Sequence, residues 1–243
     1  MKLNYKYSNI KFEKNTVILA GAGPGSKKLI TLELKYILRL ADVIVYDALV
    51  NKSILEECNE KVLLIYAGKT KKKSCTQTEI NELLVKYAKK GKRVLRLKGG
   101  DVSFFSRAGQ EVKFLKKNKV NFRVISAVTS SQASISQTSE NFFNKKRFCN
   151  FITGHKKINS NSKDVDYYNV IKNKGKIFIY MGISQIEKIS KNLQKNQVSL
   201  KERVSIIKNA SLKNQKIYKT NLKNCSSFIK KNKITSPAII IIR

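Results

Sequence analysis

Short apolar runs, separated by longer stretches with a helical repeat, organise the first half of the chain. Each run is rich in β-branched or aliphatic residues and is bounded by polar or glycine-containing segments, which is typical of buried parallel strands. The predicted strands are Thr16–Ala20, Val43–Tyr46, Val62–Tyr66, Val94–Leu97 and Phe122–Ile125. Their order along the chain predicts one parallel sheet.

Apolar residues spaced three or four positions apart predict helices between these strands. One helix is expected over Lys28–Leu40, another opens with a capping box of Thr76 and Glu79 and closes at Gly91, and another covers Arg107–Asn118. Strands that alternate with helices in this way predict a doubly wound α/β domain over residues 16–126, after a basic lead-in over 1–15. Right-handed crossovers would bring the carboxyl ends of the strands to one edge, where ligands bind in such sheets.

The second half repeats the α/β pattern after a loose polar stretch. From Ser126 the sequence S-A-V-T-S-S-Q-A-S predicts a connection, so a second domain is expected over residues 127–243. Its predicted strands and helix are Phe148–Thr153, Lys176–Met181, Val204–Ile207, Gln215–Tyr218, the helix Asn224–Lys231 and a closing S-P-A-I-I-I-I strand.

Glycine-rich turns follow the first and fourth predicted strands. The first reads G-A-G-P-G-S over Gly21–Ser26, and the other contains Gly99, Gly100 and Asp101. Ser26 occupies the third glycine position of a dinucleotide fingerprint, and Pro24 offers no N–H to a pyrophosphate, which disfavours dinucleotide binding. Each turn is equally compatible with a plain strand-to-helix connection.

Charge is the most unusual feature of the composition. The chain has 50 Lys and Arg against 16 Asp and Glu, a net charge of +34. A polyanionic substrate or partner and a broad compositional bias at solvent-facing positions both remain open, because the charge is spread along the whole chain and forms no local footprint. We do not expect a nucleic-acid partner.

Metal, disulfide and membrane sites are not expected. Cys58, Cys75, Cys149 and Cys225 lie far apart, with no C-x-x-C spacing, and His155 is the one histidine. No apolar run approaches the roughly 20 residues needed to cross a bilayer. The sequence therefore predicts a cytoplasmic protein without a bound metal.

The segment R-L-K-G-G-D-V-S-F-F-S-R-A-G-Q-E resembles the tetrapyrrole methylase family, and within it the uroporphyrinogen-III C-methyltransferases. The matching positions there are Gly99, Gly100, Asp101, Phe105, Arg107 and Glu111. Further matches are the decapeptide Ala41–Val50 and the I-F-I-Y-M-G segment Ile177–Gly182. The chain departs from the family at Ser26, at Ser126 and most strongly over Ser139–Phe143, where S-E-N-F-F replaces a Pro-Leu-Thr-His-Arg segment.

The resemblance implies two α/β domains with a cofactor cleft between them, S-adenosylmethionine as the cofactor, and a homodimer. It implies C-methylation of uroporphyrinogen III at two pyrrole carbons to give precorrin-2, for sirohaem or cobalamin. Asp47 would be the proton acceptor, Lys69 the proton donor, and Arg107 would bind a substrate carboxylate. The implied cofactor contacts are Pro24, Gly99, Gly100, Asp101, Phe104, Thr129, Ser130, Met181 and Ala210.

Two other functions are compatible with the sequence. A methyltransferase of the same superfamily could act on another corrinoid precursor or on ribosomal RNA, which the net charge of +34 favours. Alternatively, a binding protein could have kept the fold and lost the activity, which the departures from the family motifs favour. Cofactor affinity distinguishes the last of these from the enzymes.

Overall fold

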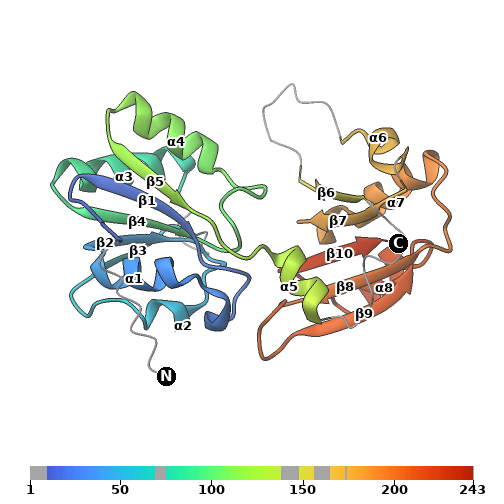
Figure 1. Ribbon diagram of the computed structural model, residues 1–243. Coiled ribbons are helices and arrows are strands. Elements are labelled where there is room, and N and C mark those ends of the chain that lie inside the picture. The colour runs from blue at the N-terminus through green and yellow to red at the C-terminus, as the bar shows by residue number, and fades with distance from the viewer. Residues whose placement is uncertain (1–9, 69–74, 138–147, 156–164, 173, 243) are drawn as a thin grey trace. The chain divides into compact units, whose positions relative to one another are not determined.

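The computed structural model describes residues 10–68, 75–137, 148–155, 165–172 and 174–242 (Figure 1). The chain divides into two compact units, residues 1–129 and residues 130–243. Each unit is built on its own five-stranded sheet. The predicted fold class, two α/β units, is confirmed.

The sheet of the first unit is parallel throughout. Its strands lie in the order β3-β2-β4-β1-β5, and every neighbouring pair is parallel. The bounds are β1 Thr16–Gly21, β2 Val43–Tyr46, β3 Leu63–Tyr66, β4 Arg93–Lys98 and β5 Asn121–Ile125. All five strands were predicted from the sequence, and their carboxyl ends share one edge of the sheet.

Helices cover both faces of this sheet (Figure 1). The helices are α1 Leu32–Leu40, α2 Lys52–Leu55, α3 Gln77–Lys89 and α4 Ala108–Lys117. Leu34 and Ile37 of α1 are buried in one core cluster with Ile18 of β1. Leu84 of α3 and Leu115 of α4 are buried in the cluster on the other face. Alternate side chains along β1 point to opposite faces of the sheet and therefore pack into two different core clusters.

Two helix starts illustrate how local capping decides the boundary. Thr76 and Glu79 form the predicted capping box at the start of α3. The helix expected from Lys28 instead begins at Leu32, because the Oγ1 of Thr31 accepts a hydrogen bond from the N–H of Leu34 and caps the helix there. Residues Lys27–Leu29 form a separate 3₁₀ turn, η2.

The sheet of the second unit is mixed, with the order β6-β7-β10-β8-β9. The bounds are β6 Cys149–Thr153, β7 Lys176–Tyr180, β8 Arg203–Lys208, β9 Lys216–Asn221 and β10 Ala238–Ile242. β6 and β7 are parallel, whereas β10 is antiparallel to both of its neighbours and β9 is antiparallel to β8. Strand β10 thus occupies the centre of the sheet.

The helices of the second unit are less well predicted by the sequence than its strands. They are α5 Ser130–Gln137, α6 Tyr167–Lys172, α7 Ile186–Lys195 and α8 Cys225–Lys231, with a 3₁₀ turn η3 at Ile183–Gln185. Of these only α8 was expected. Residues of α6, α7 and α8 pack on one face of the sheet, and Ile135 of α5 packs against the cluster on the other face.

The expected loose connection after Ser126 is wrong from Ser130 onward, where α5 begins. Ser131 and Ser134 are fully buried in it. The hydroxyl of Tyr180 donates a hydrogen bond to the Oγ of Ser131 at 2.7 Å, and the Oγ of Ser134 donates one to the carbonyl of Ser130. The tertiary contact with Tyr180 therefore helps to stabilise a helix whose serine-rich sequence has weak helix propensity.

Within the described part of the chain, no helix has the length and apolar character needed to cross a membrane.

Candidate functional site

The two glycine turns of the first unit are hydrogen-bonded to each other at the carboxyl edge of the sheet. Gly23 donates to the carbonyl of Gly100 at 3.2 Å, Gly100 donates back to the carbonyl of Gly23 at 2.7 Å, and Ala22 donates to Lys98 at 2.7 Å. Both Gly23 and Gly100 have φ +72°, a conformation that glycine adopts readily and L-residues with a Cβ do not. The turns after β1 and β4 therefore form one structural element.

Close backbone approach explains two further glycines at this edge. A Cβ on Gly99 would lie 2.5 Å from the Cβ of Leu49, and one on Gly21 would lie 2.6 Å from the Cβ of Ala127. The segments that follow β2 and β5 thus contact the turn after β4 and the end of β1 directly. The segments after four strands therefore pack together at this edge, with glycine where they approach most closely.

Asp101 fastens the turn after β4 to the segment that follows β5. Its side chain is buried, with 7% of the residue exposed. One carboxylate oxygen accepts a hydrogen bond from the N–H of Ser103 at 2.7 Å, and the other accepts one from the N–H of Ala127 at 2.5 Å. This clamp sets the path of the chain into Thr129, which is itself buried.

An exposed aromatic pair and an arginine follow the clamp. Phe104 and Phe105 are 37% and 39% exposed, and their rings meet edge to face at 6.4 Å between centroids. Phe105 has φ 48°, a left-handed conformation that is strained for an aromatic residue. Arg107 is exposed at the N-cap position of α4. An apolar surface beside a guanidinium suits an aromatic ligand that carries carboxylates.

Asp47, which follows β2, belongs to a network of four charges whose other three members, Arg96, Lys98 and Glu111, are buried. The guanidinium of Arg96 donates from Nη2 to Oδ1 of Asp47 at 2.5 Å, from Nε to Glu111 at 3.0 Å and from Nη1 to the carbonyl of Val45 at 3.2 Å. The ammonium of Lys98 bonds both oxygens of Glu111 at 3.1 and 3.3 Å and lies 3.8 Å from Oδ2 of Asp47. Two cations and two carboxylates therefore balance each other inside the protein.

Two buried members of this network, Glu111 and Lys98, have pKa values below their usual ones. Burial alone would raise the pKa of Glu111, but the charges of Arg96 and Lys98 outweigh burial and hold the pKa below its usual value. Burial lowers the pKa of Lys98, as does the neighbouring charge of Arg96. Glu111 is therefore an ionised carboxylate without solvent contact, fixed between two cations.

Sequence reasoning missed this network, although a signal for it was present. Arg96 and Lys98 fall at alternate positions of the central strand R-V-L-R-L-K, among the buried apolar residues Val94, Leu95 and Leu97. Side chains on such a strand are buried on both faces of the sheet. Buried cations require anionic partners, and Glu111 on the amphipathic helix α4 and Asp47 at the end of the neighbouring strand supply them.

In the second unit, the predicted residues occupy two strained turns. Met181 comes directly after β7, has φ 52° and is 41% exposed. After β8, Asn209 and Ser211 have φ 54° and 70° and flank the buried Ala210. Such backbone conformations in residues other than glycine concentrate at ligand-binding positions. Asn209 donates to the carbonyl of Pro237 at 3.1 Å, which holds this second turn.

The structure places the predicted site residues as follows. The first unit brings the Gly23–Gly100 pair, Asp101, Asp47 and Thr129 to one edge of its sheet, with Pro24 half-buried in the turn after β1. Ser130 is the first residue of α5 and belongs to the second unit, with Met181 and Ala210. Lys69 and the segment Ser139–Phe143 lie outside the described residues.

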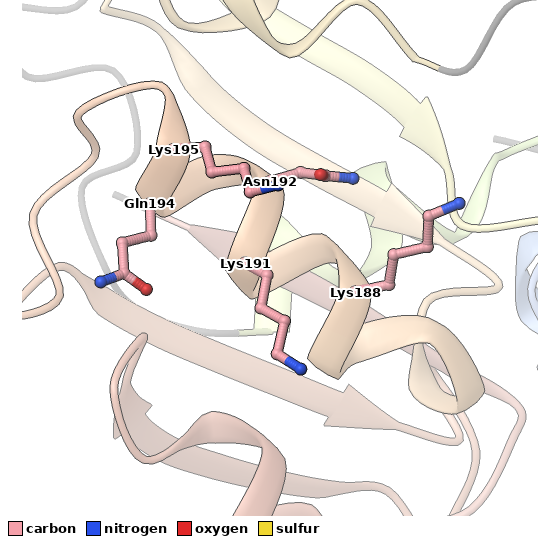
Figure 2. Close-up of a pocket in the computed structure, with 5 residues that line it drawn as sticks. All are labelled: Lys188, Lys191, Asn192, Gln194 and Lys195. Carbon is pink, nitrogen blue, oxygen red and sulfur yellow. The ribbon is translucent and has the colours of Figure 1, made fainter.

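A surface hollow of about 570 Å³ lies along α7, and none of these residues lines it. Figure 2 shows its lining side chains Lys188, Lys191, Asn192, Gln194 and Lys195. Lys191 is paired with Glu187 on the same helix at 3.2 Å, and both are more than half exposed. This hollow is a solvated helix face and is not the candidate site. Within the described residues, no group of three or more His, Cys, Asp or Glu side chains could hold a metal ion.

Comparison with known proteins identifies the family of this two-unit fold. Residues 16–225 match the family model of the tetrapyrrole (corrin/porphyrin) methylases. The chain belongs to the tetrapyrrole methylase family, as its motifs predicted. The expected class of enzyme, a methyltransferase, is confirmed with it.

Individual relatives are similar along almost the whole chain. The uroporphyrinogen-III C-methyltransferase of Methanocaldococcus jannaschii is 39% identical over 230 residues, which cover 93% of this chain and 94% of that protein. The sirohaem synthase of Pseudoalteromonas translucida is 35% identical over 96% of this chain, but the match spans only 50% of that protein. The crystal structure of the Thermus thermophilus uroporphyrin-III C-methyltransferase with S-adenosylhomocysteine superimposes with a TM-score of 0.76 at 26% identity and covers 93% of this chain and 91% of that one.

Proposed function

We propose that this chain transfers methyl groups from S-adenosylmethionine to two pyrrole carbons of uroporphyrinogen III and so forms precorrin-2. The observation that carries the proposal is the joined pair of glycine turns after β1 and β4, with the Asp101 clamp beside it. These turns hold the motif residues by which the chain resembles uroporphyrinogen-III C-methyltransferases. The 39% identity to the Methanocaldococcus jannaschii enzyme supports the same substrate.

The first unit fits the cofactor by its main chain. Gly21 and Gly99 let Ala127 and Leu49 pack closely against the two turns, and Gly100 has open space beside its Cα that a ligand can approach. Asp101 and Thr129 are held beside them by buried contacts. The proposed cofactor contacts on this unit are Pro24, Gly99, Gly100, Asp101, Phe104 and Thr129, and those on the second unit are Ser130, Met181 and Ala210.

The bound cofactor supplies an electrophilic methyl group on a sulfonium. Positioning then provides most of the rate, because an electron-rich ring carbon has only to be aligned with that methyl group. The exposed ring faces of Phe104 and Phe105 exclude water from an apolar ligand surface, and Arg107 binds a carboxylate of the substrate in the bidentate geometry that guanidinium favours. Asp47 accepts a proton from the substrate, and Lys69 is assigned as the proton donor by resemblance alone.

The test is an anaerobic incubation of the purified chain with S-adenosylmethionine carrying a labelled methyl group and uroporphyrinogen III. Transfer of two labelled methyl groups to the tetrapyrrole is the expected result. Asp47→Asn should lower the rate by about 10²–10⁴-fold. Asp42→Asn is the matched control, since Asp42 also pairs with an arginine of β4 but lies at the opposite end of the strands. An equal loss of rate in both variants would show that Asp47 stabilises the fold and does not transfer a proton.

The competing function is methylation of RNA, which the net charge of +34 favours. Unlabelled ribosomal RNA in place of uroporphyrinogen III, with the same labelled S-adenosylmethionine, tests it. Binding of S-adenosylhomocysteine without transfer to either substrate would refute the proposal and favour a chain that has lost its activity.

Two further parts of the proposal concern the protein as a whole. The family resemblance supports a homodimer, which light scattering after size-exclusion chromatography would measure. A cytoplasmic location is proposed from the composition of the chain, and cell fractionation tests it. The proposed product would serve the synthesis of sirohaem or of cobalamin.

A further inference from the structure

The buried charge network reaches solvent through one side chain. The side chain of Arg96 is 2% exposed and that of Glu111 is fully buried, whereas that of Asp47 is 28% exposed. The network therefore has an internal part, Arg96 with Glu111 and Lys98, and an external tip, the carboxylate of Asp47.

The two oxygens of that tip are not equivalent. Oδ1 accepts the hydrogen bond from Nη2 of Arg96 at 2.5 Å. Oδ2 lies 3.8 Å from the ammonium of Lys98, which is beyond hydrogen-bond distance. Among the described residues, the hydrogen bonds to the Asp47 carboxylate therefore end on Oδ1, and Oδ2 is the oxygen left to meet a ligand.

The guanidinium that selects Oδ1 is itself fixed on three sides. Glu111 accepts from its Nε, and the carbonyl of Val45 accepts from its Nη1. Glu111 is fixed in turn by Lys98 and by the side-chain amide of Gln77, which donates at 3.3 Å. A planar fork held at three points cannot rotate without leaving a buried charge unpaired, which is strongly unfavourable.

We propose that Arg96 is a positioning residue that aims Oδ2 of Asp47 at the substrate, with Glu111 as the counter-charge that holds Arg96 in place. This inference rests on the proposed function, because it needs Asp47 to accept the proton. Arg96 does not touch the substrate; it acts through the orientation of the Asp47 carboxylate. Pure stabilisation of the fold is the alternative role for the same network.

Steady-state kinetics of Arg96→Lys separates the two roles. A lysine keeps the charge but cannot bond Asp47, Glu111 and Val45 at once. We expect kcat to fall about 10–100-fold, the scale of a small misplacement of a reacting group. KM and the affinity for S-adenosylhomocysteine should stay within about twofold, because the hydrogen bonds of Arg96 go to Asp47, Glu111 and Val45 and not to the glycine turns. Arg93→Lys is the matched control on the same strand, paired with Asp42 at the other end, and should leave kcat unchanged.

The double variant Arg96→Lys with Asp47→Asn supplies the second readout. If Arg96 acts through Asp47, the double variant is no slower than Asp47→Asn alone, because the effects of residues that act as a unit do not add. The inference would be overturned if the two substitutions multiplied their effects on kcat, or if Arg96→Lys kept the wild-type kcat. The proposed function would still stand in either case, provided that the wild-type enzyme is active. No methylation by the wild type would instead refute the proposed function.

Glu111→Gln covers the case in which Arg96→Lys does not fold. Glutamine keeps the shape of the side chain and removes the counter-charge, so the same fall in kcat at unchanged cofactor affinity is expected. Failure of both variants to fold would assign the network to stability and overturn the inference.

Discussion

Gly23 and Gly100 exchange two main-chain hydrogen bonds across the ends of β1 and β4. The pair joins two turns that are far apart in the sequence and gives both the same left-handed backbone. The shape of the candidate cofactor site therefore depends on conformations that only glycine adopts without strain. Substitutions there should affect binding even where a side chain would have room.

Gly100→Ala tests this dependence. A Cβ on Gly100 would meet no atom within 4 Å, so crowding is not the reason for a glycine. The φ of +72° is the reason, and an alanine forced into it costs about 1–2 kcal/mol. We expect that loss in the free energy of unfolding by urea, together with weaker binding of S-adenosylhomocysteine by calorimetry.

Gly109→Ala is the control for that experiment. Gly109 lies in α4, and a Cβ there also meets nothing within 4 Å. Because its φ is not in the left-handed region, alanine should stabilise the protein by about 0.4–1 kcal/mol and leave cofactor affinity unchanged. Similar effects of the two substitutions would refute the role assigned to the backbone of Gly100.

Asp101→Asn tests the clamp between the turn after β4 and the segment after β5. Both carboxylate oxygens accept main-chain N–H groups, from Ser103 and Ala127. An amide presents an NH₂ group to one of them, so one buried donor loses its acceptor at a cost of about 1–3 kcal/mol. We expect lower stability to urea and weaker cofactor binding. Unchanged stability would show that the clamp is dispensable.

The pH dependence of stability should include a contribution from Asp42. The hydrogen bonds from the side chain of Arg93 hold the pKa of Asp42 below its usual value. A carboxyl group with a depressed folded pKa stabilises the protein above its unfolded pKa of about 4, and this stabilisation is lost as pH falls through the lower folded pKa. The stability difference between wild type and Asp42→Asn should therefore be largest near neutral pH and shrink in acid. A constant difference across that range would contradict the assignment.

Thiol reactivity should differ among the four cysteines. Burial raises the pKa of Cys225 to about 12. Burial, with a smaller contribution from the charge of Glu57, raises the pKa of Cys58 to about 11. Since the thiolate is the reactive form, iodoacetamide should label these two slowly in the native protein and rapidly in concentrated urea. Mass spectrometry after timed labelling measures both rates, and fast native labelling of Cys225 would contradict its burial.

Strand β2 was predictable because burial on both faces of a parallel sheet favours a continuous apolar run, and its bounds matched the prediction, Val43–Tyr46. The helix α5 was not predictable, because it has no apolar periodicity and its buried Ser131 bonds to the distant Tyr180. For α1 the sequence located the core residues but not the start, which the hydroxyl of Thr31 decides.

Some residues of the candidate site could likewise be predicted from the sequence, and others could not. Its glycines and Asp101 were predicted because turn chemistry and the family motif coincide in one short segment. Arg96 was not, because its role depends on Glu111 and Asp47, which come from different elements and meet only in the folded sheet. Long-range pairing of buried charges leaves only a weak trace in a single sequence, namely a cation where an apolar residue is expected.

The central position of β10 has a consequence for synthesis of the protein on the ribosome. All five strands of the first sheet are complete once Ile125 has emerged, so that unit can assemble while translation continues. In the second sheet, β7 and β8 meet their shared neighbour only when residues 238–242 leave the exit tunnel. Until then two strand edges rich in isoleucine stay open, and this interval is when the nascent chain most needs protection by chaperones.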